Sequence, residues 1–261
     1  MRLGSGNTAI CCALLGGLIA AAASAQTAGR TSGLSWDGCA APPSNRSFAC
    51  DTNTGTPFEL VMWLKPFPSF ESHAVTGAEA GLTIQTPDPV LPSWWRIDPG
   101  GCRAGVASLT TTSTVLPGCA DAWGGLASGS IEYVPAAYCP PNVLGLRLGI
   151  AMPAGQSRVL VGEPYALFRI RVTRAGTAGP GSCDGCTSPA CFITNGISLF
   201  GATQPGWGYS TFDVASWQGA SCRWNTYCSG PTPVPPSTWI DQGHLPIARP
   251  RARLAARAGL A

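Results

Sequence analysis

The chain has 261 residues, of which 45% are hydrophobic and only 11% are charged, and its formal net charge is +3. This composition is too apolar for a disordered chain, and the 33 Gly and 24 Pro residues exclude a helical bundle or a coiled coil. At this length the chain can bury the core of one large β domain or of two small ones.

The first 25 residues are typical of a secretory signal peptide. Arg2 precedes an apolar run from Ala9 to Ala23, and Ala23-Ser24-Ala25 fits the small-residue rule for cleavage. The run is short for a membrane span, which needs about 20 residues. We therefore expect a mature chain that starts at Gln26, is secreted to the extracellular space or the cell surface, and is not transmembrane.

Short segments of alternating hydrophobicity follow one another along the mature chain. Residues 58–65, 78–85 and 165–173 alternate with a period of two, and residues 143–152, 193–200 and, more weakly, 130–134 also resemble strands. Clusters of turn residues separate these segments. Many short strands predict an all-β fold, an antiparallel β-sandwich, and one short helix could fit between Ser108 and Trp123, although this segment has no clear periodicity.

We expect residues 26–239 to form a single β-sandwich domain and residues 240–261 to form a flexible, Arg-rich tail. Four arginines lie in this tail, and elsewhere the charges are balanced. The expected domain therefore lacks the basic groove of a nucleic-acid-binding protein, and we expect no nucleic acid partner.

Ten cysteines remain after the signal peptide, and an even number in an oxidising compartment indicates five disulfides. Short loops favour Cys39–Cys50, Cys102–Cys119 and Cys222–Cys228, which leaves Cys139 to pair within the cluster of residues 183–191, although the sequence leaves the connectivity open. The ten are Cys39, Cys50, Cys102, Cys119, Cys139, Cys183, Cys186, Cys191, Cys222 and Cys228.

Metal sites are the less favoured interpretation of two motifs. The spacing Cys183-x2-Cys186-x4-Cys191 resembles that of zinc ligands, but it would need a fourth ligand from a distant residue. The segment Asp51-Thr52-Asn53-Thr54-Gly55 alternates oxygen-bearing side chains as calcium loops do, yet it lacks the glutamate of an EF-hand. We interpret the first motif as disulfide-bonded and the second as a turn, and we expect no metal and no cofactor.

Residues for hydrolytic catalysis are scarce, and we assign no catalytic residue. His73 is the one plausible imidazole base, and no Gly-x-Ser-x-Gly motif occurs. Glu79 and Glu163 lie among apolar neighbours and could act as the carboxylate pair of a glycoside hydrolase. The favoured alternative is that they cap turns or pair with Arg169 and Arg171.

The nine tryptophans are the strongest candidates for ligand binding, because exposed rings on a rigid sheet can stack on sugars. Trp94 and Trp95 cannot both enter the core if their segment is extended, since neighbouring side chains of a strand face opposite ways. The favoured alternative is that the rings fill space under disulfide-bound loops. The candidate ligand-binding residues are Trp94, Trp95, Trp207, Tyr209 and Trp217.

Two resemblances accompany these patterns. The alternation in Phe58–Gln85 and Val143–Thr173, with the segment Glu163–Ile170, resembles the strand rhythm of cohesin-like sandwiches, which are related in shape to carbohydrate-binding modules. The segments Leu34–Cys39, Phe48–Gly55, Pro92–Trp95 and Cys183–Cys191 resemble an uncharacterised family of secreted, cysteine-rich bacterial proteins. The second resemblance implies secretion and a single architecture.

The sequence therefore predicts a non-catalytic β-sandwich protein, secreted or held at the cell surface, that binds an extracellular protein or glycan. A secreted hydrolase that uses carboxylates such as Glu79 and Glu163 is the alternative from a different class. A purely structural surface component is the third possibility.

Overall fold

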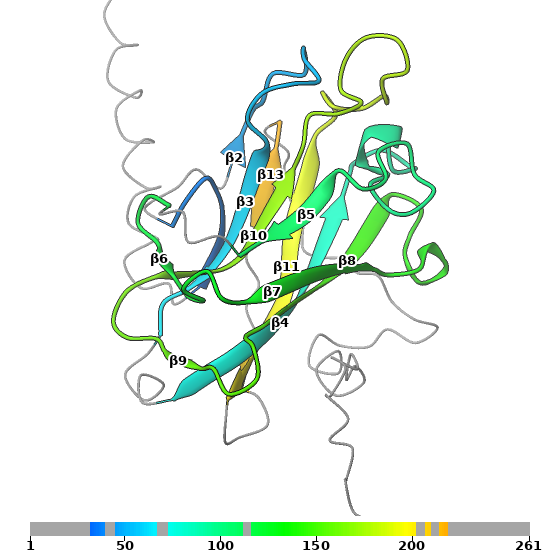
Figure 1. Ribbon diagram of the computed structural model, residues 1–261. Coiled ribbons are helices and arrows are strands. Elements are labelled where there is room, and N and C mark those ends of the chain that lie inside the picture. The colour runs from blue at the N-terminus through cyan, green and yellow to red at the C-terminus, as the bar shows by residue number, and fades with distance from the viewer. Residues whose placement is uncertain are drawn as a thin grey trace, which may run out of the picture.

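The structure is a computed structural model that describes residues 32–39, 45–66, 73–111, 116–201, 207–209 and 214–218. Two β-sheets pack face to face in this part of the chain (Figure 1). Its helical elements are two single turns of 3₁₀-helix, η1 (Ser93–Trp95) and η2 (Ala136–Tyr138). The predicted all-β sandwich with disulfide-bonded loops is confirmed.

The first sheet has five strands, four of them in the order β1-β3-β10-β5, with β6 paired in parallel to β10. The other pairings in this sheet are antiparallel. The strands are β1 (Ser32–Trp36), β3 (Phe58–Leu64), β5 (Ala107–Thr110), β6 (Ala120–Asp121) and β10 (Tyr165–Val172).

The second sheet has eight strands, six of them in the order β2-β13-β11-β4-β8-β7, with β12 paired to β11 and β9 paired to β4. Only β2 and β13 run parallel in this sheet. The strands are β2 (Asn45–Arg46), β4 (Ala74–Gln85), β7 (Ser128–Tyr133), β8 (Val143–Ala151), β9 (Arg158–Val159), β11 (Ala190–Gly201), β12 (Trp207–Tyr209) and β13 (Val214–Trp217).

The core lies between the sheets, where alternate side chains from both meet. Leu60 and Met62 of β3 share it with Leu82 of β4 and with Leu146 and Leu148 of β8, and all five are almost fully buried. Burying each such side chain contributes roughly 2 kcal/mol. The period-two pattern of the sequence is therefore the pattern of this inner face.

Strand β3 is buried on its other face as well. Val61 and Trp63 point away from the main core and pack with Leu116 and with the disulfide that joins Cys39 to Cys119. The covalent bond thus holds a loop over the outer face of the first sheet.

The six predicted strands are all present, and most differ from the observed ones only at their ends. The predicted helix between Ser108 and Trp123 is wrong. Residues 107–110 instead form β5, which pairs with β10 at the edge of the first sheet, and residues 120–121 form β6. The proposed signal peptide and the tail lie outside the described residues. Within those residues, the structure has no helix that is long and apolar enough to span a bilayer.

Candidate functional site

Three disulfides join loops that are distant in the sequence. They are Cys39–Cys119, Cys50–Cys186 and Cys102–Cys183, with sequence separations of 80, 136 and 81 residues. Cys139 and Cys191 are disulfide-bonded as well. Because disulfides form and persist in oxidising compartments, these bonds point to an extracellular location.

The expected pairs Cys39–Cys50 and Cys102–Cys119 are therefore wrong. The short-loop rule fails because the antiparallel pairing of β3 with β10 brings the loop before β3 beside the loop after β10, so that Cys50 meets Cys186. The pair Cys222–Cys228 lies outside the described residues, and the pairing of Cys139 within the cluster stays a prediction.

The disulfides also decide against zinc at Cys183-x2-Cys186-x4-Cys191. All three sulfurs are in disulfides, so none is the thiolate that zinc binds. Elsewhere in the described part of the chain, no group of three His, Cys, Asp or Glu side chains is arranged to hold a metal ion.

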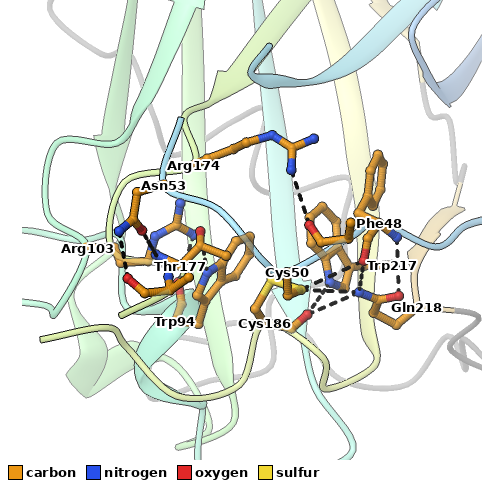
Figure 2. Close-up of a disulfide and its surroundings, with 12 residues drawn as sticks. Phe48, Cys50, Asn53, Trp94, Arg103, Arg174, Thr177, Cys186, Trp217 and Gln218 are labelled. Carbon is orange, nitrogen blue, oxygen red and sulfur yellow. Dashed lines mark hydrogen bonds between the residues drawn. A yellow bond between two sulfur atoms is a disulfide. The ribbon is translucent and has the colours of Figure 1, made fainter. Parts of the chain in front are cut away.

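Asn53 of the calcium-like segment fastens one loop to another. Its Oδ1 accepts hydrogen bonds from the backbone N–H groups of Thr177 and Ala178 at 2.7 and 2.9 Å (Figure 2). Its Nδ2 donates to the carbonyl of Ala178 at 2.6 Å, and Thr52 Oγ1 accepts from the N–H of Thr54. The segment bends between its two ends, and the amide of Asn53 is occupied by backbone groups of another loop.

Three of the five candidate sugar-binding residues are in the core. Trp94, Trp95 and Trp217 are 0%, 0% and 1% exposed, so they offer no ring face to a sugar, and that assignment is wrong for them. Their rings contact one another, with centroids 4.5 Å apart for Trp94–Trp95 and 5.0 Å apart for Trp94–Trp217. Trp207 and Tyr209 lie in β12, but their side chains are outside the described part of the structure.

Both neighbouring tryptophans reach the core because their segment is not extended. Residues 93–95 form the 3₁₀ turn η1, in which successive side chains are separated by about 120° instead of pointing to opposite faces. The backbone N–H of Trp94 donates to the carbonyl of Asp184 at 2.8 Å, which fastens η1 to the loop that carries Cys183 and Cys186.

The residues considered for hydrolysis are in different parts of the sandwich. Glu79 lies in β4 of the second sheet, whereas Glu163 lies in an exposed turn before β10 of the first sheet. Arg169 and Arg171 pair with Glu59 instead, with N–O distances of 3.0 and 3.6 Å. These two arginines therefore share Glu59 as a carboxylate partner on the first sheet.

A groove of about 580 Å³ lies where the two sheets meet at one side of the sandwich. It is lined by residues 107–109 of β5, residues 129–131 and 133 of β7, and residues 97, 99, 104 and 105 of the loop before β5. Both strands end their sheets, and Figure 1 shows them side by side. This volume is within the range of about 300–1,000 Å³ typical of ligand sites.

The groove is narrow at one end and polar at the other. At the narrow end β5 and β7 lie close together. A Cβ atom added to Gly129 of β7 would lie only 3.2 Å from Cβ of Leu109 of β5. Tyr133 lies at the polar end, and the pKa of its phenol is raised above the ordinary value of 10.0. Burial is the larger cause of this shift, and the negative charge of Asp98 is the smaller one. Asp98 itself accepts two hydrogen bonds from Arg96 at 3.0 and 3.2 Å.

Sequence reasoning missed this groove. The weak alternation of residues 130–134 indicated β7, but no strand was predicted at β5, and no pattern marks either strand as the end of a sheet. A small-residue run such as Ser128-Gly129-Ser130 is the one local signal of an exposed strand.

No family model matches the chain, and a search among curated proteins finds no match. Among solved structures, the chain is similar to a cohesin module from a Clostridium perfringens family 33 glycoside hydrolase. That similarity covers 72% of this chain and 94% of the module, with 10% sequence identity and a TM-score of 0.33. The strand order of the chain, the core that its two sheets share and its disulfides define it as a disulfide-linked β-sandwich protein.

Proposed function

We propose that the chain is a secreted, non-catalytic binding module and that the groove between β5 and β7 is its partner site. The observation that carries the proposal is an open groove formed by the ends of two sheets in a fold whose six described tryptophans are buried. Secretion rests on the signal-like residues 1–25 and is supported by the disulfides.

The chemistry of the lining favours binding over catalysis. Tyr133 is the one titratable side chain among the lining residues, and a phenol is neutral at physiological pH. A glycoside hydrolase needs two carboxyl groups that flank the bond to be broken. Neither Glu79 nor Glu163 is among the lining residues.

The same lining favours a protein partner over a glycan. Sugar sites present broad aromatic faces, but the six tryptophans whose burial is described are all less than 9% exposed and none lines the groove. The groove instead offers small aliphatic groups such as Ala104, Ala107 and Leu109, together with strand backbone. These surfaces suit a segment of polypeptide.

The test compares the folded wild type with two variants, each of which replaces one exposed alanine by tryptophan. Ala104 is exposed and lines the groove, so Ala104→Trp fills it without removing core contacts. Ala154 is exposed in the turn after β8, so Ala154→Trp is the matched control. A displayed random-peptide library and a glycan array serve as the probes.

We expect the wild type to select peptides, Ala104→Trp to weaken their binding at least about tenfold, and Ala154→Trp to leave it unchanged. Selected ligands that bind Ala104→Trp as well as they bind the wild type would reject the groove as the partner site. If only glycans bound, the proposal of a protein partner would be rejected.

A further inference from the structure

We propose that the partner of this groove supplies an extended segment that pairs, as an additional strand, with the edge of β7 that no described strand occupies. This inference rests on the proposed function and specifies how the partner is held. It follows from which backbone groups of β7 are already used and which point into the groove.

The antiparallel register of β7 and β8 decides the direction of each backbone group. Val134 lies opposite Gly145, and its N–H donates to the carbonyl of Gly145 at 2.9 Å. Hydrogen-bonded pairs alternate along an antiparallel ladder, so Ser130 and Glu132 also bond to β8. The N–H and C=O groups of the residues between them, Gly129, Ile131 and Tyr133, therefore point away from β8 and toward the groove.

The edge of β5 that faces β7 also has backbone groups that point outward, but this edge is shorter. The N–H of Thr173 donates to the carbonyl of Val106 at 3.0 Å, and this register directs the backbone groups of Ser108 toward β10. Ala107 and Leu109 are left pointing outward. Because β5 has four residues and β7 has six, β7 offers the longer row of donors and acceptors.

The edge of β7 also lacks the usual protection against strand addition. All five residues of β1, which ends the first sheet, are buried, and β2, which ends the second sheet on its other side, has two residues. In β7 four of six residues are exposed, with no proline, no break in register and a single charged residue, Glu132. Proteins normally shield such an edge, and an unshielded one is a template for a further strand.

Charge matching specifies the kind of segment. The lining residues carry no formal charge at neutral pH, and Asp98, beside the polar end, is already paired with Arg96. A charged side chain placed among the lining residues would therefore lose its hydration without gaining a new partner. At the narrow end, the contact between Gly129 and Leu109 leaves no space for bulk. The groove therefore fits an uncharged extended polypeptide with small or β-branched side chains.

The experiment uses the full chain and a capped peptide of about six residues, the length of a typical strand, in which valine and threonine alternate. Amide exchange of the protein is followed by NMR with and without the peptide. We expect the amides of Gly129, Ile131 and Tyr133 to become protected by at least about fivefold, while those of Ser130 and Glu132 do not change.

Two N-methylated peptides give an independent readout. One carries methyl groups on its odd residues and the other on its even residues, so their side chains are the same and only one set of N–H groups can face β7. We expect one of them to bind at least about tenfold more weakly than the other.

Several results would overturn the inference. These are no binding at about 1 mM peptide, uniform protection along β7, protection of Ala107 and Leu109 instead, or equal binding of the two methylated peptides. Alternating protection that appears in the protein alone and grows with its concentration would assign the edge to a second copy of the chain. A library peptide whose binding is lost in Ala104→Trp would leave the proposed function standing in each of these cases.

Discussion

The guanidinium of Arg103 lies over the ring of Trp94, with its central carbon 3.7 Å from the ring centroid. The side chain is 2% exposed, and it donates to the carbonyls of Ala175 at 2.7 Å, Trp94 at 3.3 Å and Thr173. Figure 2 shows this arrangement next to the Cys50–Cys186 disulfide. A buried cation thus joins η1 to the loop after β10.

Replacing Arg103 tests this arrangement. We expect Arg103→Ala to lower the free energy of unfolding by about 4 kcal/mol, because it leaves a cavity and buried carbonyls without donors. Arg103→Lys should cost about 2 kcal/mol, since an ammonium lacks the planar fork. Urea denaturation measures both. Arg96→Lys, in an exposed ion pair with Asp98, is the control and should change stability by less than about 1 kcal/mol.

The connectivity of the disulfides is directly testable. Non-reducing peptide mapping should find Cys39 joined to Cys119, Cys50 to Cys186 and Cys102 to Cys183. A peptide pair that links Cys39 to Cys50 would contradict the structure.

The cost of losing a disulfide should follow the length of its loop. Cys39–Cys119 and Cys102–Cys183 close loops of nearly equal size, 80 and 81 residues apart. Replacing either pair by serine should therefore lower the free energy of unfolding by about 4 kcal/mol, with little difference between the two. Thermal unfolding of the two double variants provides the comparison.

The ionisation of Tyr133 makes stability depend on pH in the alkaline range. Its pKa in the folded chain is above 10.0, the ordinary value, so the unfolded chain releases the phenol proton first as pH rises. The stability from this group is fully present below pH 10.0 and is lost as pH rises through the folded pKa.

Difference absorbance between the wild type and Tyr133→Phe isolates this titration. Asp98→Asn should lower the pKa of Tyr133 but leave it above the ordinary value, because burial is the larger cause of the shift. A pKa at or below 10.0 in the wild type would contradict the described position of the phenol.

Substituting two glycines in the loop after β10 distinguishes the cost of backbone strain from the cost of a steric clash. Gly181 and Gly185 both have positive φ angles, of 79° and 104°. A Cβ atom at Gly181 meets nothing within 4 Å, but one at Gly185 would lie 2.3 Å from Cβ of Pro92. Gly181→Ala should cost about 1 kcal/mol and Gly185→Ala about 3 kcal/mol or more, measured by urea denaturation. Equal losses would show that the close approach to Pro92 is absent.

The strands of the core could be predicted from the sequence, because one face of each is buried against the facing sheet. Phe58, Leu60, Met62 and Leu64 alternate in the sequence for the same reason that they share one face of β3. The pattern is weaker in β5, whose residues are only partly buried or exposed, and there a helix was the wrong prediction.

The tryptophan pair shows the limit of a pattern that assumes one local conformation. The argument that Trp94 and Trp95 face opposite ways holds for a strand, but tertiary contacts such as the bond from Trp94 to Asp184 hold the segment in a 3₁₀ turn. The disulfide pairs failed for a related reason, since loop length says nothing about which loops the sheets bring together.

The groove could not be predicted, because its proposed binding groups are main-chain atoms. Any residue supplies an N–H and a C=O, so the sequence of β7 does not say which of these groups a neighbouring strand already uses. That information comes from the position of β7 at the end of its sheet and from its register with β8.

The Cys50–Cys186 bond also determines how the fold carries mechanical load. The strands from β3 to β10 lie between these two cysteines along the chain. A pulling force applied to the chain before Cys50 and after Cys186 passes through the covalent bond, so pairings internal to the loop, such as β4 with β8 and β7 with β8, lie outside the covalent path of the force. As long as that bond is intact, tension lengthens the chain only outside the loop, and the hydrogen bonds that join β1 to β3 and β11 to β4 resist that lengthening.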